Sequence, residues 1–226
     1  LKNIDNIVPD WHRNDTVWFK KVLAGYLMQV VNDIHAYLIM LDDGNVGNED
    51  LNEMIVFASD KLFIEIPDWL TEADPLEKID FLFGVFNRPV RVCGMVKNEG
   101  EPGGGPFFVE DSNGNISLQI VESSQVDISN ADQKKILLSS THFNPVDLVC
   151  WKNDFNGRPF NLNDFSDPET GFIAKKSFQG KDIKAMELPG LWNGAMADWI
   201  TIFVEVPLST FNPVKEINDL LRTMHQ

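Results

Sequence analysis

The sequence predicts an α/β fold in which a mixed sheet is flanked by helices. Apolar residues recur at helical spacing in the first third of the chain, whereas short apolar runs between turn residues follow Asn87-Arg88-Pro89. The 226 residues are enough to bury a sizeable core. We therefore expect one α/β module over residues 1–226, with a helical stretch at 15–82 and a strand-rich part at 88–226.

The helical stretch divides into three predicted helices. A long apolar stripe through residues 18–34 has spacings of three and four, and Asp15 or Thr16 is suited to cap it. A second helix is expected at about residues 49–62, and a third begins at Asp74-Pro75, where proline fits the first turn. A last helix is predicted near the C-terminus, capped by Asn212 and followed by Pro213.

The later part of the chain carries the predicted strands. One strand is expected around residues 90–96, and a hairpin joins 107–110 to 116–122 through Asp-Ser-Asn-Gly. Further strands are predicted at 136–139 and 201–206. Residues 153–168 are rich in Asn, Asp, Gly and Pro, so a long surface loop is expected there.

Charge and composition restrict the classes of partner. The formal net charge is −15, which disfavours nucleic acid unless a basic patch is present, and none is seen in the sequence. No signal peptide and no uninterrupted apolar run of membrane-spanning length occurs, so we expect a cytoplasmic protein that does not bind membranes. A small phosphorylated ligand stays compatible, since a divalent cation can bridge carboxylates and phosphate. The two cysteines, Cys93 and Cys150, lie in apolar segments and are expected to be buried thiols.

Four polar segments are candidates for ligand binding. Asn3-Ile4-Asp5-Asn6 reads as a turn at a strand end, where Asp5 is suited to hold Mg²⁺ against a diphosphate, although such residues also form ordinary turns. Residues 97–107 include Glu101, Gly103 and Gly104. Their glycines either let a ligand approach bare backbone or simply form a flexible connector. No Gly-Lys-Ser/Thr follows, so this is not a phosphate-binding P-loop.

The third and fourth segments follow predicted strands. Glu122 ends an apolar strand, where its carboxylate needs solvent, a sugar hydroxyl or a protein donor. Asn144 follows His142-Phe143 and is suited either to cap a helix or to bind a ligand, while His142 has no acidic partner fixed by spacing. Lysines able to neutralise phosphate charge are Lys175, Lys176 and Lys215, although surface lysines are common.

Taken in order, these segments resemble a bacterial family named as a domain of unknown function. Asn-Ile-Asp-Asn-Ile-Val-Pro-Asp, Glu-Pro-Gly-Gly-Gly-Pro-Phe, Leu-Gln-Ile-Val-Glu-Ser-Ser-Gln-Val and Leu-Pro-Gly-Leu-Trp-Asn-Gly-Ala-Met carry the resemblance, which covers essentially the whole chain. Members of that family are commonly longer, which implies an absent upstream half. An alternative for the long apolar helix is that it covers a second copy, as in a homodimer.

The same order of motifs more distantly resembles the UDP-sugar pyrophosphorylases, which join a sugar 1-phosphate to UTP on a nucleotide-diphospho-sugar transferase fold. The resemblance implies a metal role for Asp5 and sugar contacts for Gly94, Glu122 and Asn144. It also implies Mg²⁺ as the cofactor and catalytic phosphate partners at Lys176 and Lys215. Asn3 matches the first position of the Asn-x-Asp-Asn turn, and Glu101, Gly103 and Gly104 are expected on the sugar side.

Two departures limit what the resemblance implies. The upstream glycine-rich nucleotide loop of the pyrophosphorylases has no counterpart in this sequence, and Pro145 follows Asn144 where those enzymes continue with small or polar residues. We therefore expect a protein that binds a sugar phosphate or nucleotide-sugar, with nucleotidyl transfer only when an upstream half is supplied. The alternative is a non-catalytic nucleotide-sugar-binding or assembly protein on the same fold.

Overall fold

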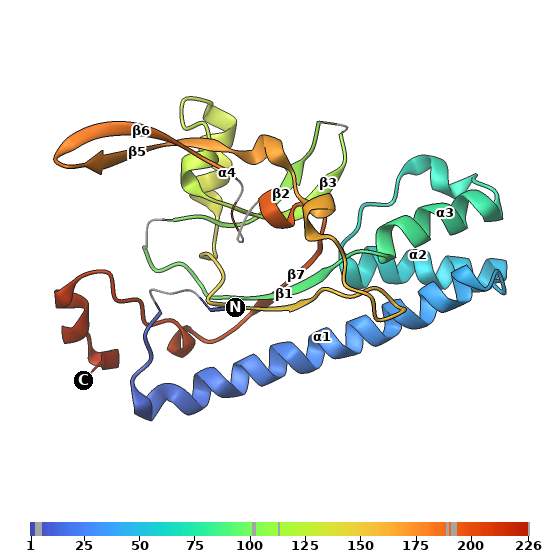
Figure 1. Cartoon of the computed structure of the whole chain (residues 1–226), viewed down its shortest axis with the longest axis horizontal. Coiled ribbons are helices and arrows are strands. Elements are labelled where there is room, and N and C mark those ends of the chain that lie inside the picture. Colours follow the sequence, from blue (N-terminus) through green and yellow to red (C-terminus); the bar gives the residue numbers. More distant parts are fainter. Residues whose placement is uncertain (3–5, 101–102, 113, 189, 191–193, 226) are drawn as a thin grey trace.

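The chain folds around a three-stranded mixed sheet, as the sequence predicts (Figure 1). The computed structural model describes all residues except 3–5, 101–102, 113, 189, 191–193 and 226. The central strand β1 (Val90–Met95) pairs in parallel with β7 (Ile200–Glu205) and antiparallel with β4 (Asp147–Trp151). All six residues of β1 are buried, because both neighbouring strands and both faces of the sheet are covered.

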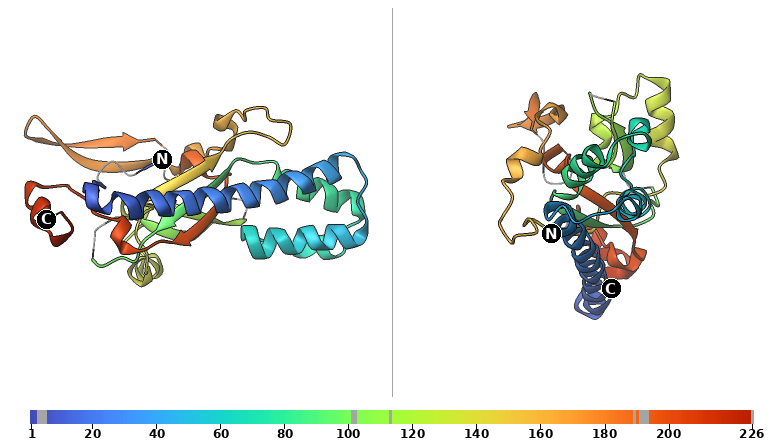
Figure 2. Two further views of the ribbon diagram at one scale, coloured as in Figure 1. Left: turned by 90° about the horizontal axis from the view of Figure 1, so that it is seen from below. Right: turned by 90° about the vertical axis from the view of Figure 1, so that its right-hand side faces the viewer.

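One face of the sheet packs against helices. The long helix α1 (Arg13–Asp42) crosses under the sheet, and α2 (Asn48–Leu62) and α3 (Pro75–Phe86) lie beside its C-terminal half (Figures 1 and 2). Alternate residues of β1, Val90 and Val92, join this core, which α1 supplies with the stripe Leu23, Leu27, Val30, Val31, Ile34, Leu38 and Leu41. The predicted period of the first helix is therefore confirmed from Leu23 onward, whereas Trp18 and Val22, which the predicted stripe included, are exposed.

The opposite face packs against a hairpin. Strands β2 (Gly105–Glu110) and β3 (Ile116–Val121) pair antiparallel, and Ile120 joins a second core with Cys93, Met95 and Leu148. Arg91 is fully buried between the two layers. Its Nε donates to Thr201 Oγ1 at 2.7 Å and its Nη2 donates to Gln119 Oε1 at 3.1 Å, so the guanidinium fastens the hairpin to the sheet.

Most of the predicted elements are confirmed. The Asp74 carboxylate caps α3 by accepting from the backbone N–H groups of Leu76 and Glu77, at 2.9 and 3.0 Å. The second helix, the first strand, the hairpin and the last strand also lie within a few residues of their expected bounds. The first helix begins at Arg13, ahead of the expected caps Asp15 and Thr16, because a 3-10 turn (Asp10–His12) leads directly into it.

Two predicted elements are wrong. Residues 136–139 end a helix, α4 (Ala131–Ser139), which Asn130 caps by accepting from the N–H groups of Asp132 and Gln133. Asn212 caps no helix. Its side chain is buried and donates to Ser209 O at 3.0 Å, and only short 3-10 turns follow, at Ile217–Leu221 and Thr223–His225.

One hairpin was not predicted. Strands β5 (Phe172–Phe178) and β6 (Lys181–Glu187) form a two-stranded ribbon that projects from the body of the molecule (Figure 1). Large apolar side chains such as Ile173 and Met186 are exposed on it. Since a hairpin this exposed lacks the alternation of a half-buried strand, the sequence pattern gave no signal for it.

Helix α1 is also long and apolar enough to meet the length and composition criteria for a membrane span, although the sequence has no unbroken apolar run. Together with its leading turn it covers Asp10–Asp42, and 33% of its most apolar window is buried. Core helices of globular proteins meet the same criteria, and eight α1 side chains are buried in this fold.

Of the two cysteines expected to be buried, Cys93 is buried and Cys150 is only partly buried. The burial of Cys93 predicts a large difference in its reactivity on unfolding. Burial raises the pKa of Cys93 to about 12. At pH 8 about one such thiol in ten thousand is ionised, and the thiolate is the reactive form. In a Cys150→Ser variant, we expect Ellman's reagent to react with Cys93 at least about 100-fold faster in urea than in the native state. Equal rates would contradict the burial of this strand.

Candidate active site

The candidate site lies at one edge of the central sheet. Because β1 and β7 are parallel, their carboxyl ends meet at this edge, and the amino end of the antiparallel β4 joins them. The neighbouring loops are tied together by single β-bridges, Lys97 with His142, Lys2 with Asp147, and Asn6 with Pro213. Segments from both ends and the middle of the sequence therefore form one polar rim.

The glycine run packs tightly against two other turns of this rim. A methyl group at Gly104 would overlap the carbonyl oxygen of Val121 and would lie 2.8 Å from Asn144 Oδ1. One at Gly103 would press on the ring of Phe143. These glycines are therefore required for close approach of backbone to the 121–122 and 143–144 turns.

This close approach accompanies the contact of Glu122 with Asn144. Asn144 Nδ2 donates to Glu122 Oε1 at 3.0 Å, whereas Asn144 Oδ1 is buried without a hydrogen-bond partner among the described residues. The Glu122 backbone N–H donates to Gln125 Oε1 at 2.9 Å, which fixes the turn after β3. A carboxylate and an amide are thus fixed side by side. The partly buried Glu122 carboxylate is suited to accept from ligand hydroxyls, whereas Asn144 Oδ1 is covered by the backbone at Gly104.

A second polar group surrounds Glu205 at the end of β7. His142 Nε2 lies 3.0 Å from Glu205 Oε2, and Lys97 Nζ lies 3.7 Å from Glu205 Oε1. The hydrogen bond with His142, and the charge of Lys97, lower the pKa of the Glu205 carboxyl. His142 Nδ1 in turn lies 2.9 Å from Thr141 Oγ1. The sequence could not supply this acidic partner for His142, because Glu205 lies 63 residues further along the chain.

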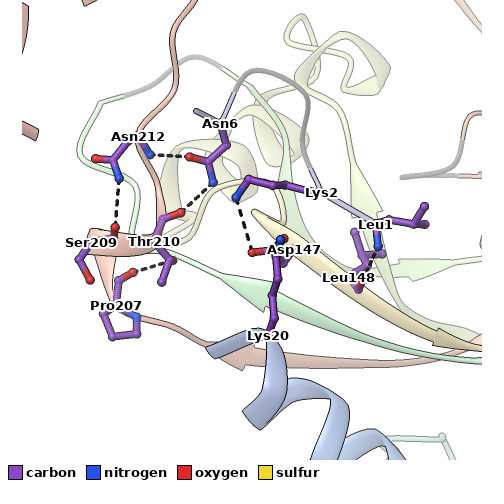
Figure 3. Close-up of polar contacts among 10 residues, drawn as sticks. All are labelled: Leu1, Lys2, Asn6, Lys20, Asp147, Leu148, Pro207, Ser209, Thr210 and Asn212. Carbon is purple, nitrogen blue, oxygen red and sulfur yellow. Dashed lines mark hydrogen bonds and ion pairs between the residues drawn. The ribbon is translucent and has the colours of Figure 1, made fainter. Parts of the chain in front are cut away.

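A third polar group centres on Asp147, which pairs with Gly94 of β1 (Figure 3). The Asp147 carboxylate is buried, with Lys20 Nζ at 3.4 Å and Lys2 Nζ at 3.9 Å. Burial raises the pKa of Asp147, and the two lysines oppose that rise. Sequence reasoning missed this group, although an aspartate directly before the apolar run Leu148–Cys150 was a usable signal.

The N-terminal segment is anchored beside this third group (Figure 3). Asn6 is buried, its Nδ2 donates to Thr210 O at 2.7 Å, and its Oδ1 accepts from the Asn212 N–H at 2.7 Å. The predicted metal residue Asp5, together with Asn3 and Glu101, lies outside the described residues. Their roles therefore stay predictions.

The remaining predicted residues lie in different surroundings. The structure brings Gly103, Gly104, Glu122 and Asn144 together on the rim. A side chain at Gly94 would meet Leu23 and Val206, so packing against α1 accounts for that glycine, and its sugar contact stays a prediction.

The two predicted catalytic lysines lie on peripheral segments. Lys176 is on the projecting ribbon, where its Nζ pairs with Glu187 Oε1 at 2.6 Å. Lys215 is exposed near the C-terminus. Their roles as phosphate partners stay predictions.

A cavity of about 390 Å³ lies at the opposite edge of the sheet, at the amino ends of β1 and β7. Its lining includes Arg88, Asp198 and Thr201. None of the predicted site residues lines it. The predicted site residues that the structure brings together lie instead on the open rim at the carboxyl ends, where ligands of α/β sheets gather.

A magnesium site would depend on Asp5. Among the residues that the structure describes, no three His, Cys, Asp or Glu side chains are grouped to hold a metal ion. Glu122 and the unpartnered Oδ1 of Asn144 are oxygen donors of the kind that Mg²⁺ prefers. Two such donors do not form a metal site among the described residues, so magnesium at the rim stays a prediction that depends on Asp5.

Fold and rim together define an α/β protein with a mixed sheet, whose polar turns gather where two parallel strands end. The chain belongs to the family described as "Domain of unknown function (DUF4301)", whose sequence model matches residues 1–226. This confirms the family that the motifs indicated. No curated protein matches the sequence.

The matching solved structures include UDP-glucose pyrophosphorylases, as the more distant resemblance indicated. Two of them are mutants of the Leishmania major enzyme in complex with UDP-glucose. One is 15% identical over 66% of this chain and 33% of that chain, with a TM-score of 0.38. The other is 14% identical over 67% and 34%, with a TM-score of 0.37. This chain thus spans about a third of the length of those enzymes, and similarity at this level extends to part of the fold only.

The tight packing at Gly104 predicts a specific intolerance to substitution. Gly104→Ala should lower the free energy of unfolding by about 1–3 kcal/mol, because the new methyl group overlaps backbone that has no room to move. Gly25→Ala on α1 is the matched control, since nothing lies within 4 Å of that position, and it should gain about 0.5–1 kcal/mol from helix propensity. Urea titration measures both, and equal effects would contradict the close approach.

Proposed function

We propose that this chain forms the sugar-facing part of a nucleotidyltransferase-like protein that binds a sugar 1-phosphate or a nucleotide-sugar. Where a nucleotide-binding segment is also present, the sugar phosphate oxygen attacks the α-phosphate of the nucleotide and pyrophosphate leaves. Mg²⁺ neutralises phosphate charge in this reaction. The chain's own contribution is positioning and electrostatics, which requires no covalent nucleophile.

The observation that carries the proposal is the contact of Glu122 with Asn144 beneath the glycine run. The hydrogen bond from Asn144 Nδ2 orients the Glu122 carboxylate, and Asn144 Oδ1 is buried beside the backbone at Gly104 without a partner among the described residues. Sugar hydroxyls are donors that match the Glu122 carboxylate. The motifs at these positions also resemble those that contact the sugar in UDP-sugar pyrophosphorylases.

Asp5 is the proposed metal residue, flanked by Lys2 and Asn6, which are both held at the carboxyl edge of the sheet. Lys176 and Lys215 are retained as proposed phosphate partners. Lys176 would first have to leave its ion pair with Glu187, and more than half of its side chain is exposed, so that exchange is inexpensive.

A non-catalytic protein that binds a nucleotide-sugar on the same rim is the second candidate. The two candidates differ in one measurement, since the second binds ligand with no release of pyrophosphate.

Sugar recognition by Glu122 is tested with UDP-glucose as the probe. Glu122→Gln should weaken binding about tenfold in isothermal titration, because charged acceptors contribute more to a hydrogen bond than neutral ones. Glu110→Gln removes the same charge from an exposed position of the same hairpin and should change the dissociation constant less than twofold. Unchanged binding in Glu122→Gln would remove the sugar role of this rim.

The metal role of Asp5 is tested on the complete protein. Pyrophosphate release from UTP and glucose 1-phosphate should require Mg²⁺ and should fall at least about 100-fold in Asp5→Ala, because the cation would lose its protein ligand. Asp15→Ala, an exposed aspartate on α1, is the control for loss of charge. Turnover that survives in Asp5→Ala would eliminate the metal role, and binding without turnover in the unaltered protein would favour the second candidate.

A further inference from the structure

A second cavity of about 390 Å³ lies between the N-terminal segment and the first turns of α1. It is an open hollow of the surface rather than an enclosed pocket. It adjoins the Asp147 group, because Lys2 and Lys20 contribute to both (Figure 3). The residues that line it are Lys2, Val8, Asp10, Arg13, Thr16, Val17 and Lys20.

The cavity is cationic in a chain whose net charge is −15. Three cationic side chains, Lys2, Arg13 and Lys20, line it, and one carboxylate of the lining, Asp10, opposes them. Below them Asp147 is shared between the two lysines, at 3.9 and 3.4 Å. Among the described residues, the two carboxylates leave one of the three cations uncompensated at this place.

Two polar groups of the cavity wall lack partners among the described residues. Thr16 is only 4% exposed and its hydroxyl makes no hydrogen bond. Lys2 Nζ is buried and makes no hydrogen bond either, since its distance to Asp147 exceeds hydrogen-bond length. Burial also lowers the pKa of Lys2, although Asp147 opposes this. Buried donors without acceptors are costly, so the cavity is suited to a ligand that supplies acceptors.

We infer that this cavity binds the phosphate group of a small phosphorylated ligand. Lysine and arginine only donate, so a ligand that satisfies Lys2, Lys20 and Arg13 together must be an acceptor-rich anion. A phosphate offers several charged oxygens, which match convergent donors from three cations and the Thr16 hydroxyl. The inference stands apart from the proposed sugar site, since neither Glu122 nor Asn144 lines the cavity.

The phosphate can belong to a soluble metabolite or to a lipid headgroup. Trp11 and Trp18 are 61% and 63% exposed and lie on the same two turns of chain as Arg13 and Thr16. Exposed tryptophans beside cations also occur at membrane interfaces. The experiment therefore includes both sources.

Isothermal titration of the full chain with inorganic phosphate, pyrophosphate and glucose 1-phosphate at low salt tests the inference. We expect binding of at least one of these ligands, weakened about tenfold by Lys20→Ala and by Arg13→Gln. Lys21→Ala removes the same charge from the next, exposed position of α1, which does not line the cavity, and should change binding less than twofold. Inorganic phosphate and pyrophosphate carry no sugar hydroxyls, so their binding separates this site from the proposed sugar site, which glucose 1-phosphate can also occupy.

Thr16→Val serves as a second variant if a charge substitution prevents folding. It keeps the volume of the buried side chain, removes only its hydroxyl, and should weaken binding about threefold. Cosedimentation with phosphatidic acid vesicles that Lys20→Ala abolishes, without binding of the soluble ligands, would assign the phosphate to a lipid. Binding of none of these probes, or equal losses in Lys20→Ala and Lys21→Ala, would overturn the inference.

Discussion

The pairing of β1 determines where the polar turns of the rim can lie. This strand is buried along its whole length, so its backbone groups must be satisfied by β4 on one side and β7 on the other. Its parallel partner β7 brings a second carboxyl end to the same edge, and its antiparallel partner β4 brings Asp147 opposite Gly94. The loops that follow β1 and β7 and the loop that precedes β4 therefore meet at the same edge of the sheet, where they form the rim.

Steric closeness then decides which residues occupy the rim. The backbone at Gly104 approaches Val121 so closely that no side chain fits, and this packing holds the glycine run against Glu122 and Asn144. At Gly104, the missing side chain lets one backbone segment approach another, rather than exposing N–H groups to a phosphate. The same residues that looked like a flexible connector in the sequence are therefore a fixed part of the rim, with their conformational cost offset by contacts on both sides.

The sequence predicts the local features of this molecule well and the long-range ones poorly. Helical period gives α1 to α3 and a turn motif gives the β2–β3 hairpin, since both signals lie within a few residues. Asn212 has the residue type of a helix cap, but its side chain and backbone bind Ser209 and Asn6 instead, the latter 206 residues away. At the site, the turns at 122 and 144 carried a sequence signal. The groups around Glu205 and Asp147 depend on partners that only the folded chain brings together.

The charge distribution of the chain limits where a phosphate could bind. An overall charge of −15 repels anionic ligands at long range, so any site for a phosphate must concentrate cations locally. Asp147 makes this possible, because two lysines at 3.4 and 3.9 Å from one buried carboxylate can approach each other without a full like-charge penalty. Burial raises the pKa of the Asp147 carboxyl, and the charges of the two lysines oppose that rise. Through its ion pairs with Lys2 and Lys20, a single buried aspartate at the start of β4 thus holds the start of the chain and α1 against the carboxyl edge of the sheet. Its one negative charge faces two lysines, so this group has a net positive charge in a chain that is otherwise negative.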